Sequence, residues 1–141
     1  MRAYQALLRL ATIETETRSR LLSEALQAEA IAGLALRRHD EVVLKEREEA
    51  MQSHEALIAF ASFYQRAGRD RASLLTALRQ SGEAVAQARE TLAAAAAEQF
   101  KIERLIKWRE ERDALAEARR ERDALDEAST LRHARAGRLK P

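Results

Sequence analysis

The only proline in this chain of 141 residues is its last residue, Pro141. Glycine is almost as scarce, because the chain contains only four. Proline and glycine interrupt helices and supply most tight turns, so a chain that lacks them is expected to form a few long helices. Aromatic residues make up 4% of the chain and charged residues 34%, with alanine, leucine, glutamate and arginine predominant. This composition is typical of a coiled coil and not of a compact globule.

One position is predicted to turn the chain. Gly68 lies in the polar stretch FYQRAGRDRAS (residues 63–73), where a glycine can adopt the left-handed conformation that ends a helix. Asp70 can then cap the helix that follows. We therefore predict an all-α fold, an antiparallel two-helix coiled-coil hairpin forming a single domain over residues 1–141. Its parts are helix one at about 2–66, a turn at about 67–71, helix two at about 72–135 and a flexible basic tail at 136–141, with both chain ends at the same extremity.

The second helix carries a clear coiled-coil seam, because its apolar residues alternate in steps of four and three. All members of this seam except Ser81 and Gln99 are apolar; they are Leu74, Leu78, Ser81, Val85, Ala88, Leu92, Ala95, Gln99, Ile102 and Ile106. The apolar clusters of the first helix are less regular. We therefore expect register breaks along that helix.

After Ile106 the apolar seam stops. The next positions in its rhythm are Arg109, Asp113, Ala116 and Arg120, and only a thin line of Leu115, Ala118, Leu125 and Ala128 remains. Pairs of opposite charge at i,i+4 are expected to support this part of the helix weakly; they are Glu103–Lys107, Arg109–Asp113, Arg119–Asp123 and Arg122–Asp126. The sequence therefore predicts a helix that continues without a neighbour and is better ordered inside a partner. Trp108, where the seam fails, is expected to cap the two-helix core or to meet that partner, and we favour the cap.

No catalytic chemistry is apparent in the sequence. There is no cysteine, no glycine-rich phosphate loop and no nucleophile or metalloprotease motif. The three histidines, His39, His54 and His133, lie far apart. We therefore expect a protein that is not an enzyme and that has no metal, no cofactor and no small-molecule substrate. Because no stretch is apolar enough to span a bilayer, we also expect a cytoplasmic protein.

The end of the chain resembles the FliJ/YscO family, the small stalk proteins of bacterial type III export systems. The family's basic and acidic helix is matched by Lys101, Glu103, Leu105, Arg109 and Arg112. Its acidic ending is matched by LDEA at residues 125–128, preceded by Glu121, Arg122 and Asp123, although the family usually has Gln and Lys at the last two positions. The resemblance implies an antiparallel coiled coil similar to the central stalk of rotary ATPases.

The resemblance also implies partners. In this family the paired terminal ends enter the pore of a hexameric export ATPase and promote its assembly, and the proteins also handle export chaperones. We therefore expect a cytoplasmic protein peripheral to the inner-membrane export apparatus, flagellar or injectisome. The expected ATPase-binding residues are Arg109, Arg112, Leu115, Arg119, Arg122, Leu125, Asp126 and Glu127.

The other end of family members reaches toward the cytoplasmic domain of an export gate protein. The resemblance places this gate-binding surface on a polar–Leu–aromatic–aromatic stripe near the end of helix one, faced by an apolar stripe early in helix two. The expected residues are Ser53, Leu57, Phe60, Tyr64, Leu74 and Leu78. The alternative for Leu57, Phe60 and Tyr64 is that they close the core of the hairpin near its turn.

Two other functions compete with the export stalk. The first is a generic structural or adaptor coiled coil whose arms pair between chains. The second is a hairpin that binds nucleic acid weakly through its basic end, which carries Arg132, Arg135, Arg138 and Lys140 without an acidic residue. Nucleic acid is the less favoured partner because this end has no aromatic residue to stack on a base.

Overall fold

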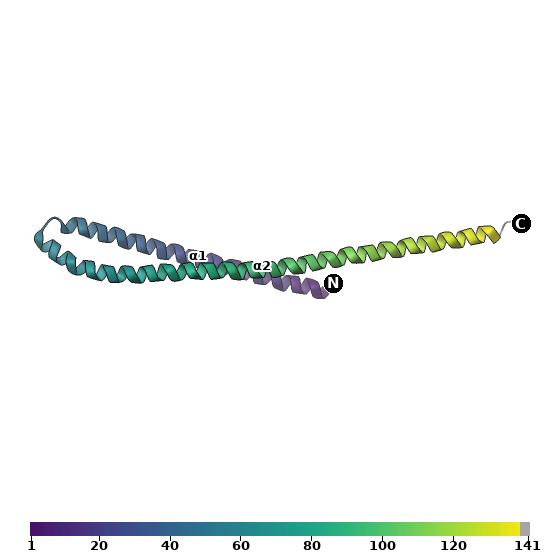
Figure 1. Cartoon of the computed structure of the whole chain (residues 1–141), viewed down its shortest axis with the longest axis horizontal. Helices are drawn as coiled ribbons and strands as arrows, with labels where there is room; N and C mark the ends of the chain where they lie inside the picture. The colour runs from purple at the N-terminus through teal and green to yellow at the C-terminus, as the bar shows by residue number, and fades with distance from the viewer. Residues whose placement is uncertain (139–141) are drawn as a thin grey trace. The chain divides into compact units, whose positions relative to one another are not determined.

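The computed structural model describes residues 1–138. It contains two helices, α1 (Arg2–Ala50) and α2 (His54–Arg138), joined by a turn at residues 51–53. No strand occurs in the described part of the chain. Figure 1 shows the chain reversing direction at this turn. The predicted fold class, an all-α two-helix hairpin, is confirmed.

The chain divides into two compact units. One consists of Met1–Leu10 together with the chain from Glu98 onward, and the other is Ala11–Ala97. In the Ala11–Ala97 unit, the later part of α1 packs against the first part of α2 after the turn. In the other unit, the first turns of α1 lie beside the later part of α2. Each unit therefore has its own section of the seam between the two helices.

The predicted turn at residues 67–71 is wrong, because the helices are joined earlier in the chain, at residues 51–53. Ser53 is the N-cap of α2: its Oγ accepts a hydrogen bond from the backbone N–H of Ala56 at 3.1 Å. The backbone N–H of Gln52 donates to the carbonyl oxygen of Glu49 at 3.2 Å, which closes the end of α1. Glu55 in the first turn of α2 and Arg47 in the last turn of α1 suit the helix dipoles.

The helix continues through Gly68 for a physical reason. No glycine in residues 1–138 has a positive φ, so Gly68 does not use the conformational freedom that would end a helix. Its neighbour Ala67 is only 6% exposed and packs in the seam. A glycine costs a helix about 1 kcal/mol relative to alanine, which is too little to break a helix that packs on both sides of it. Asp70, the predicted N-cap, is likewise an exposed residue within α2.

We predict that Gly68→Ala stabilises the protein. The space around a Cβ at this position is empty within 4 Å and the backbone is helical, so the change should add up to about 1 kcal/mol to the free energy of unfolding. Thermal or urea unfolding followed by circular dichroism measures this. The control, Gly137→Ala in the last turn of α2, should change little because helix ends fray. A lower melting temperature for Gly68→Ala would instead place a left-handed turn there.

The two arms differ in length from the prediction. Helix α1 has 49 residues and α2 has 85, in place of two similar arms. The two ends of the described chain, Met1 and Arg138, therefore do not meet, because α2 continues to Arg138 beyond the residue that contacts Tyr4. The predicted tail began at residue 136, but residues 136–138 are helical. The rest of that tail, residues 139–141, lies outside the described residues.

The predicted seam of α2 is confirmed. Each of its ten predicted members is half-buried or buried, and Val85 is only 5% exposed. The seam also starts earlier than expected, since the same spacing continues back toward the turn through Ala67, Phe63, Phe60 and Ala56. The part of this seam from Leu74 to Ile106 was recognisable because eight of its ten positions hold leucine, isoleucine, valine or alanine.

The register breaks predicted for α1 are wrong. Its half-buried and buried positions include a regular series in steps of four and three: Tyr4, Leu8, Ala11, Thr15, Arg18, Leu22, Ala25, Glu29, Ala32, Leu36, His39 and Val43. Polar residues occupy several of these positions, while neighbours such as Leu21, Ile31 and Val42 are exposed. Hydrophobicity alone therefore places the stripe one position away from where it lies.

Small residues bring the two helices of the Ala11–Ala97 unit close together. A Cβ on Gly33 would lie 3.9 Å from Cδ1 of Leu78, and a Cβ on Gly82 would lie 3.5 Å from Oε2 of Glu29. Only Ala50, Ala67 and Val85 are buried among the described hydrophobic residues. The core of the hairpin is therefore a thin line of contacts, and its stability depends on few side chains.

An ion pair connects the two helices between Ala67 and Leu74. Arg71 donates from Nε to Oδ1 of Asp40 at 2.8 Å and from Nη2 to Oδ2 at 3.3 Å. These hydrogen bonds, and then the charge of the guanidinium, lower the pKa of Asp40 below its ordinary value. The carboxylate in turn raises the pKa of Arg71. Both side chains are exposed, so the pair contributes little to the stability of the hairpin.

We predict that Arg71→Gln raises the pKa of Asp40 toward that of a free aspartate. Because the pKa of Asp40 is lowered in the folded state, its contribution to stability is present above the unfolded-state pKa and is lost as the pH falls through the folded-state pKa. The variant should therefore be less stable than the unchanged chain at neutral pH and equally stable at strongly acidic pH. Carboxyl NMR titration and unfolding at both pH values measure this. The exposed Arg69→Gln should leave the pKa of Asp40 unchanged.

Candidate protein-binding segment

The pairing of α1 with α2 ends at a contact between Tyr4 and Arg109. Nη1 of Arg109 donates a hydrogen bond to the hydroxyl oxygen of Tyr4 at 3.0 Å, and the guanidinium lies 5.0 Å from the centre of the Tyr4 ring. Arg109 is half-buried and occupies the seam position after Ile106. The seam therefore continues one position past its last apolar residue, through a polar contact. The role of Tyr4 was not predicted from the sequence. The feature that could have indicated it is its position four residues before Leu8, in the 4/3 series of half-buried residues along α1.

Beyond Arg109 the helix has no neighbour within the described chain. Every residue from Glu110 to Arg138 is exposed, and all of them belong to α2. At 1.5 Å per residue this segment, which we call the lone segment, is roughly 40 Å long. Its leucines are well exposed, with Leu115 at 65% and Leu125 at 71%. An isolated helix of this length is only marginally stable in water, so a partner would stabilise it considerably.

The predicted ATPase-binding residues fall into two groups. Arg109 is engaged by Tyr4 and is less available than expected. The other seven are exposed on the lone segment: Arg112, Leu115, Arg119, Arg122, Leu125, Asp126 and Glu127. None of the four predicted i,i+4 ion pairs forms within 4.0 Å in the described residues, although Arg112 lies over the ring of Trp108.

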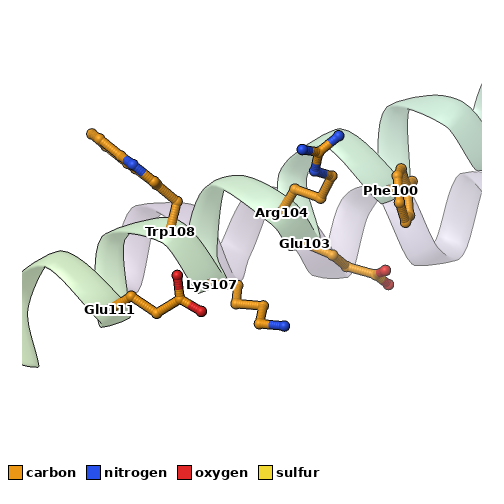
Figure 2. Close-up of a pocket in the computed structure, with 6 residues that line it drawn as sticks. All are labelled: Phe100, Glu103, Arg104, Lys107, Trp108 and Glu111. Carbon is orange, nitrogen blue, oxygen red and sulfur yellow. The ribbon is translucent and has the colours of Figure 1, made fainter.

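We expected Trp108 to cap the two-helix core, and this prediction is wrong. It is 56% exposed, and Arg112 lies 5.2 Å from the centre of its ring. Phe100, two turns earlier, is 58% exposed and has Arg104 at 5.8 Å. Figure 2 shows Trp108 extending away from the helix. An open depression on this part of α2 is lined by Phe100, Glu103, Arg104, Lys107, Trp108 and Glu111.

The predicted gate-binding residues do not face one another across the hairpin. Five of them lie on α2 and the sixth, Ser53, is its N-cap, because the turn precedes them all. Phe60, Leu74 and Leu78 lie in the seam and are half-buried. The expected stripe on helix one with a facing stripe on helix two is therefore wrong in its geometry.

Two members of that predicted set remain exposed. Leu57 is 49% exposed and Tyr64 is 59% exposed, and they lie two turns apart on the same side of α2. The Tyr64 ring is 5.7 Å from that of Phe60, which is itself 6.0 Å from Phe63. Of the two interpretations, closure of the core fits Phe60, whereas Leu57 and Tyr64 are available to another protein. Exposed apolar neighbours near the turn are Leu44, Met51 and Ile58.

Neither α1 nor α2, over the described residues, contains a stretch apolar enough to cross a membrane. Within residues 1–138 no three histidine, aspartate or glutamate side chains are grouped so that they could hold a metal ion. Asp40 and Arg71, whose pKa values are shifted by their ion pair, lie outside the lone segment. The chemistry that the lone segment offers is therefore that of a charged helical surface with exposed leucines, beside one exposed tryptophan.

No protein-family model, no curated protein and no solved structure matches this chain.

Proposed function

We propose that this protein is a non-enzymatic stalk of a bacterial type III protein export apparatus. In this role its terminal helix enters a hexameric export ATPase, promotes assembly of the ring and couples the ring to the export gate. The protein acts in the cytoplasm beside the inner-membrane part of the apparatus. The proposal combines the FliJ/YscO resemblance of the end of the chain with the exposure of that same segment.

The observation that carries the proposal is the lone segment. A fold that stabilises itself only by packing α1 against α2 gains nothing from a part of α2 that continues past the N-terminal end of α1. From Glu110 to Arg138 the helix exposes all its side chains, including leucines at 65% and 71%. Such a segment is explained if its contacts are made by another protein.

The surface of the lone segment suits a partner that surrounds it. An α-helix with its side chains is about 10–12 Å wide, so a single helix enters a narrow central pore more readily than a pair. Arginines and carboxylates are distributed around the helix, and each exposed ion pair with a ring subunit contributes about 0–1 kcal/mol. Many weak contacts of this kind hold a shaft without fixing it in one rotational position.

The hairpin turn supplies the second contact in this proposal. Leu57 and Tyr64 are exposed near the start of α2, close in sequence to the exposed Met51 and Ile58. Exposed aromatic and aliphatic residues together are typical of protein interfaces. We assign this surface to the export gate protein. Export chaperones are the remaining partners that the resemblance implies.

The experiment that tests the proposal uses the export ATPase of the same organism. Its hydrolysis rate and its sedimentation are recorded with increasing amounts of this protein. The expected result is faster hydrolysis together with conversion of small ATPase species into hexamers. If saturating amounts leave both unchanged and no binding is detected, the proposed function is wrong.

A further inference from the structure

A second line of side chains runs along α2 on the side that faces away from the seam. Its positions repeat in steps of three and four and are all exposed. Trp108 follows the seam residue Ile106 by two positions, and Glu111 follows the seam residue Arg109 by two. Two residues turn an α-helix by about 200°, so Trp108 and Glu111 lie nearly opposite the seam. We call this line the outer stripe. It consists of Trp108, Glu111, Leu115, Ala118, Arg122 and Leu125.

The outer stripe is complementary to itself in the antiparallel direction. If two copies are laid side by side with their midpoint between Ala116 and Glu117, positions equally far from that midpoint meet. Trp108 then lies opposite Leu125 of the second copy. Glu111 lies opposite Arg122, and Leu115 opposite Ala118. We propose that the occupant of the outer stripe is a second copy of this chain, paired antiparallel in this register.

The charges select this register and this direction. If one copy is shifted along the other by one heptad, Glu111 lies opposite Leu115. A shift of one heptad in the other direction places Arg122 opposite Ala118. In both cases a charged side chain meets an apolar one. A parallel pair in register places Glu111 against its own copy and Arg122 against its own copy, and like charges repel. Among the six positions of the outer stripe, only the antiparallel register centred between Ala116 and Glu117 joins apolar residues to apolar residues and opposite charges to each other.

The side chains that this pairing needs are available. Glu111 and Arg122 form no ion pair within 4.0 Å in the described chain. Trp108, Leu115 and Leu125 are 56%, 65% and 71% exposed. A two-fold axis makes every pair occur twice, so three kinds of contact fill six layers. The pairing also gives the lone segment a helical neighbour, which neither α1 nor the rest of the described chain provides.

This inference does not depend on an export ATPase. Leu115, Arg122 and Leu125 belong both to the outer stripe and to the proposed ATPase-binding set. Self-pairing and insertion into a ring would therefore exclude each other, and each can be tested without the other.

The first test reverses one charge at a time and follows self-association by sedimentation equilibrium. The unchanged chain should form a dimer as its concentration rises. Glu111→Arg alone, and Arg122→Glu alone, should each weaken dimerisation by about tenfold, because each places like charges in two layers. An equimolar mixture of the two variants should dimerise as well as the unchanged chain, since each variant carries the charges that the other lacks.

Matched controls are available on the opposite side of the helix. Asp113→Arg and Arg120→Glu change the net charge by the same amounts but lie off the outer stripe, so dimerisation should be unaffected. Arginine and glutamate are both good helix formers, so far-UV circular dichroism should show similar helicity for Glu111→Arg, Arg122→Glu and Arg120→Glu. A monomeric unchanged chain at every concentration, or dimers that tolerate Glu111→Arg, would overturn the proposal.

The second test measures direction and register, and it uses the absence of cysteine from the chain. Arg104 and Ser129 occupy the next positions of the outer stripe and are expected to lie opposite each other. Arg104→Cys mixed with Ser129→Cys should form a disulfide-linked dimer under mild oxidation. Either variant alone should not, because its two cysteines would be about 37 Å apart. Cross-linking of a single variant with itself, or none in the mixture, would refute the antiparallel register.

Discussion

Val85→Asp should destabilise the hairpin more than any other single substitution considered for its core. Val85 is 5% exposed and is the largest of the buried hydrophobic side chains in the described chain. An aspartate there would place a carboxylate in the seam without an oppositely charged partner. Leaving a buried charge unpaired costs about 3–5 kcal/mol, and the seam contains few other buried side chains to offset it. We expect the melting temperature to fall by about 10–20 °C.

The matched control is Ala86→Asp, one residue further along α2. Ala86 is exposed, so the same carboxylate remains in water and the cost is limited to helix propensity, at most about 0.7 kcal/mol. Thermal unfolding followed by far-UV circular dichroism compares the two variants. Equal melting temperatures would show that Val85 is not packed against α1 and that the seam is placed incorrectly.

The seam of α2 shows what can be predicted from a sequence of this kind. Its positions from Leu74 to Ile106 hold mostly aliphatic residues, so the spacing of hydrophobic side chains indicates them directly. The seam of α1 could not be predicted in the same way, because Thr15, Arg18, Glu29 and His39 occupy positions that face α2. Polar side chains with long aliphatic stems or hydroxyl groups are compatible with a partly exposed two-helix seam. A hydrophobicity pattern does not record this.

The turn shows which local signal is decisive. Gly68 lies in a polar stretch near the middle of the chain, and it suggests a turn by its flexibility. The turn instead lies at Ser53, because its side-chain oxygen caps α2, and such a cap stabilises the start of a helix by about 1 kcal/mol. A capping serine followed by Glu55 was present in the sequence, but the polar residues around it resemble any exposed helical surface. Because the turn lies at residues 51–53, the predicted gate-binding residues from Leu57 to Leu78 all belong to α2.

The lone segment was the most informative prediction from sequence. The loss of the seam after Ile106 indicates that the helix has no neighbour there, and the described residues from Glu110 to Arg138 are all exposed. The contact between Tyr4 and Arg109 could not be predicted, because an arginine at a seam position looks like the end of the seam. Its planar guanidinium can stack on an aromatic ring and donate a hydrogen bond at once. This contact defines where the hairpin ends.

A chain that ends at Glu110 should keep the stability of the hairpin and lose its effect on the export ATPase. Removing residues 111–141 leaves the Tyr4–Arg109 contact and the whole seam intact, so the melting temperature should change by no more than a few degrees. If the proposed function is correct, ATPase hydrolysis and hexamer formation in its presence should return to the values of the ATPase alone. A chain that ends at Lys107 would be a weaker test, because it also loses Arg109.

Single substitutions on the lone segment provide the matched comparison. Each exposed charge contributes about 0–1 kcal/mol to a contact, so Arg119→Gln should reduce the apparent affinity for the ATPase by less than about fivefold. The expected pattern is therefore complete loss on truncation and small losses for each charge. Full stimulation by the chain that ends at Glu110 would show that the ATPase recognises the two-helix part of the protein. A complete loss from Arg119→Gln alone would indicate one tightly docked site and contradict the many weak contacts of a rotating or loosely held shaft.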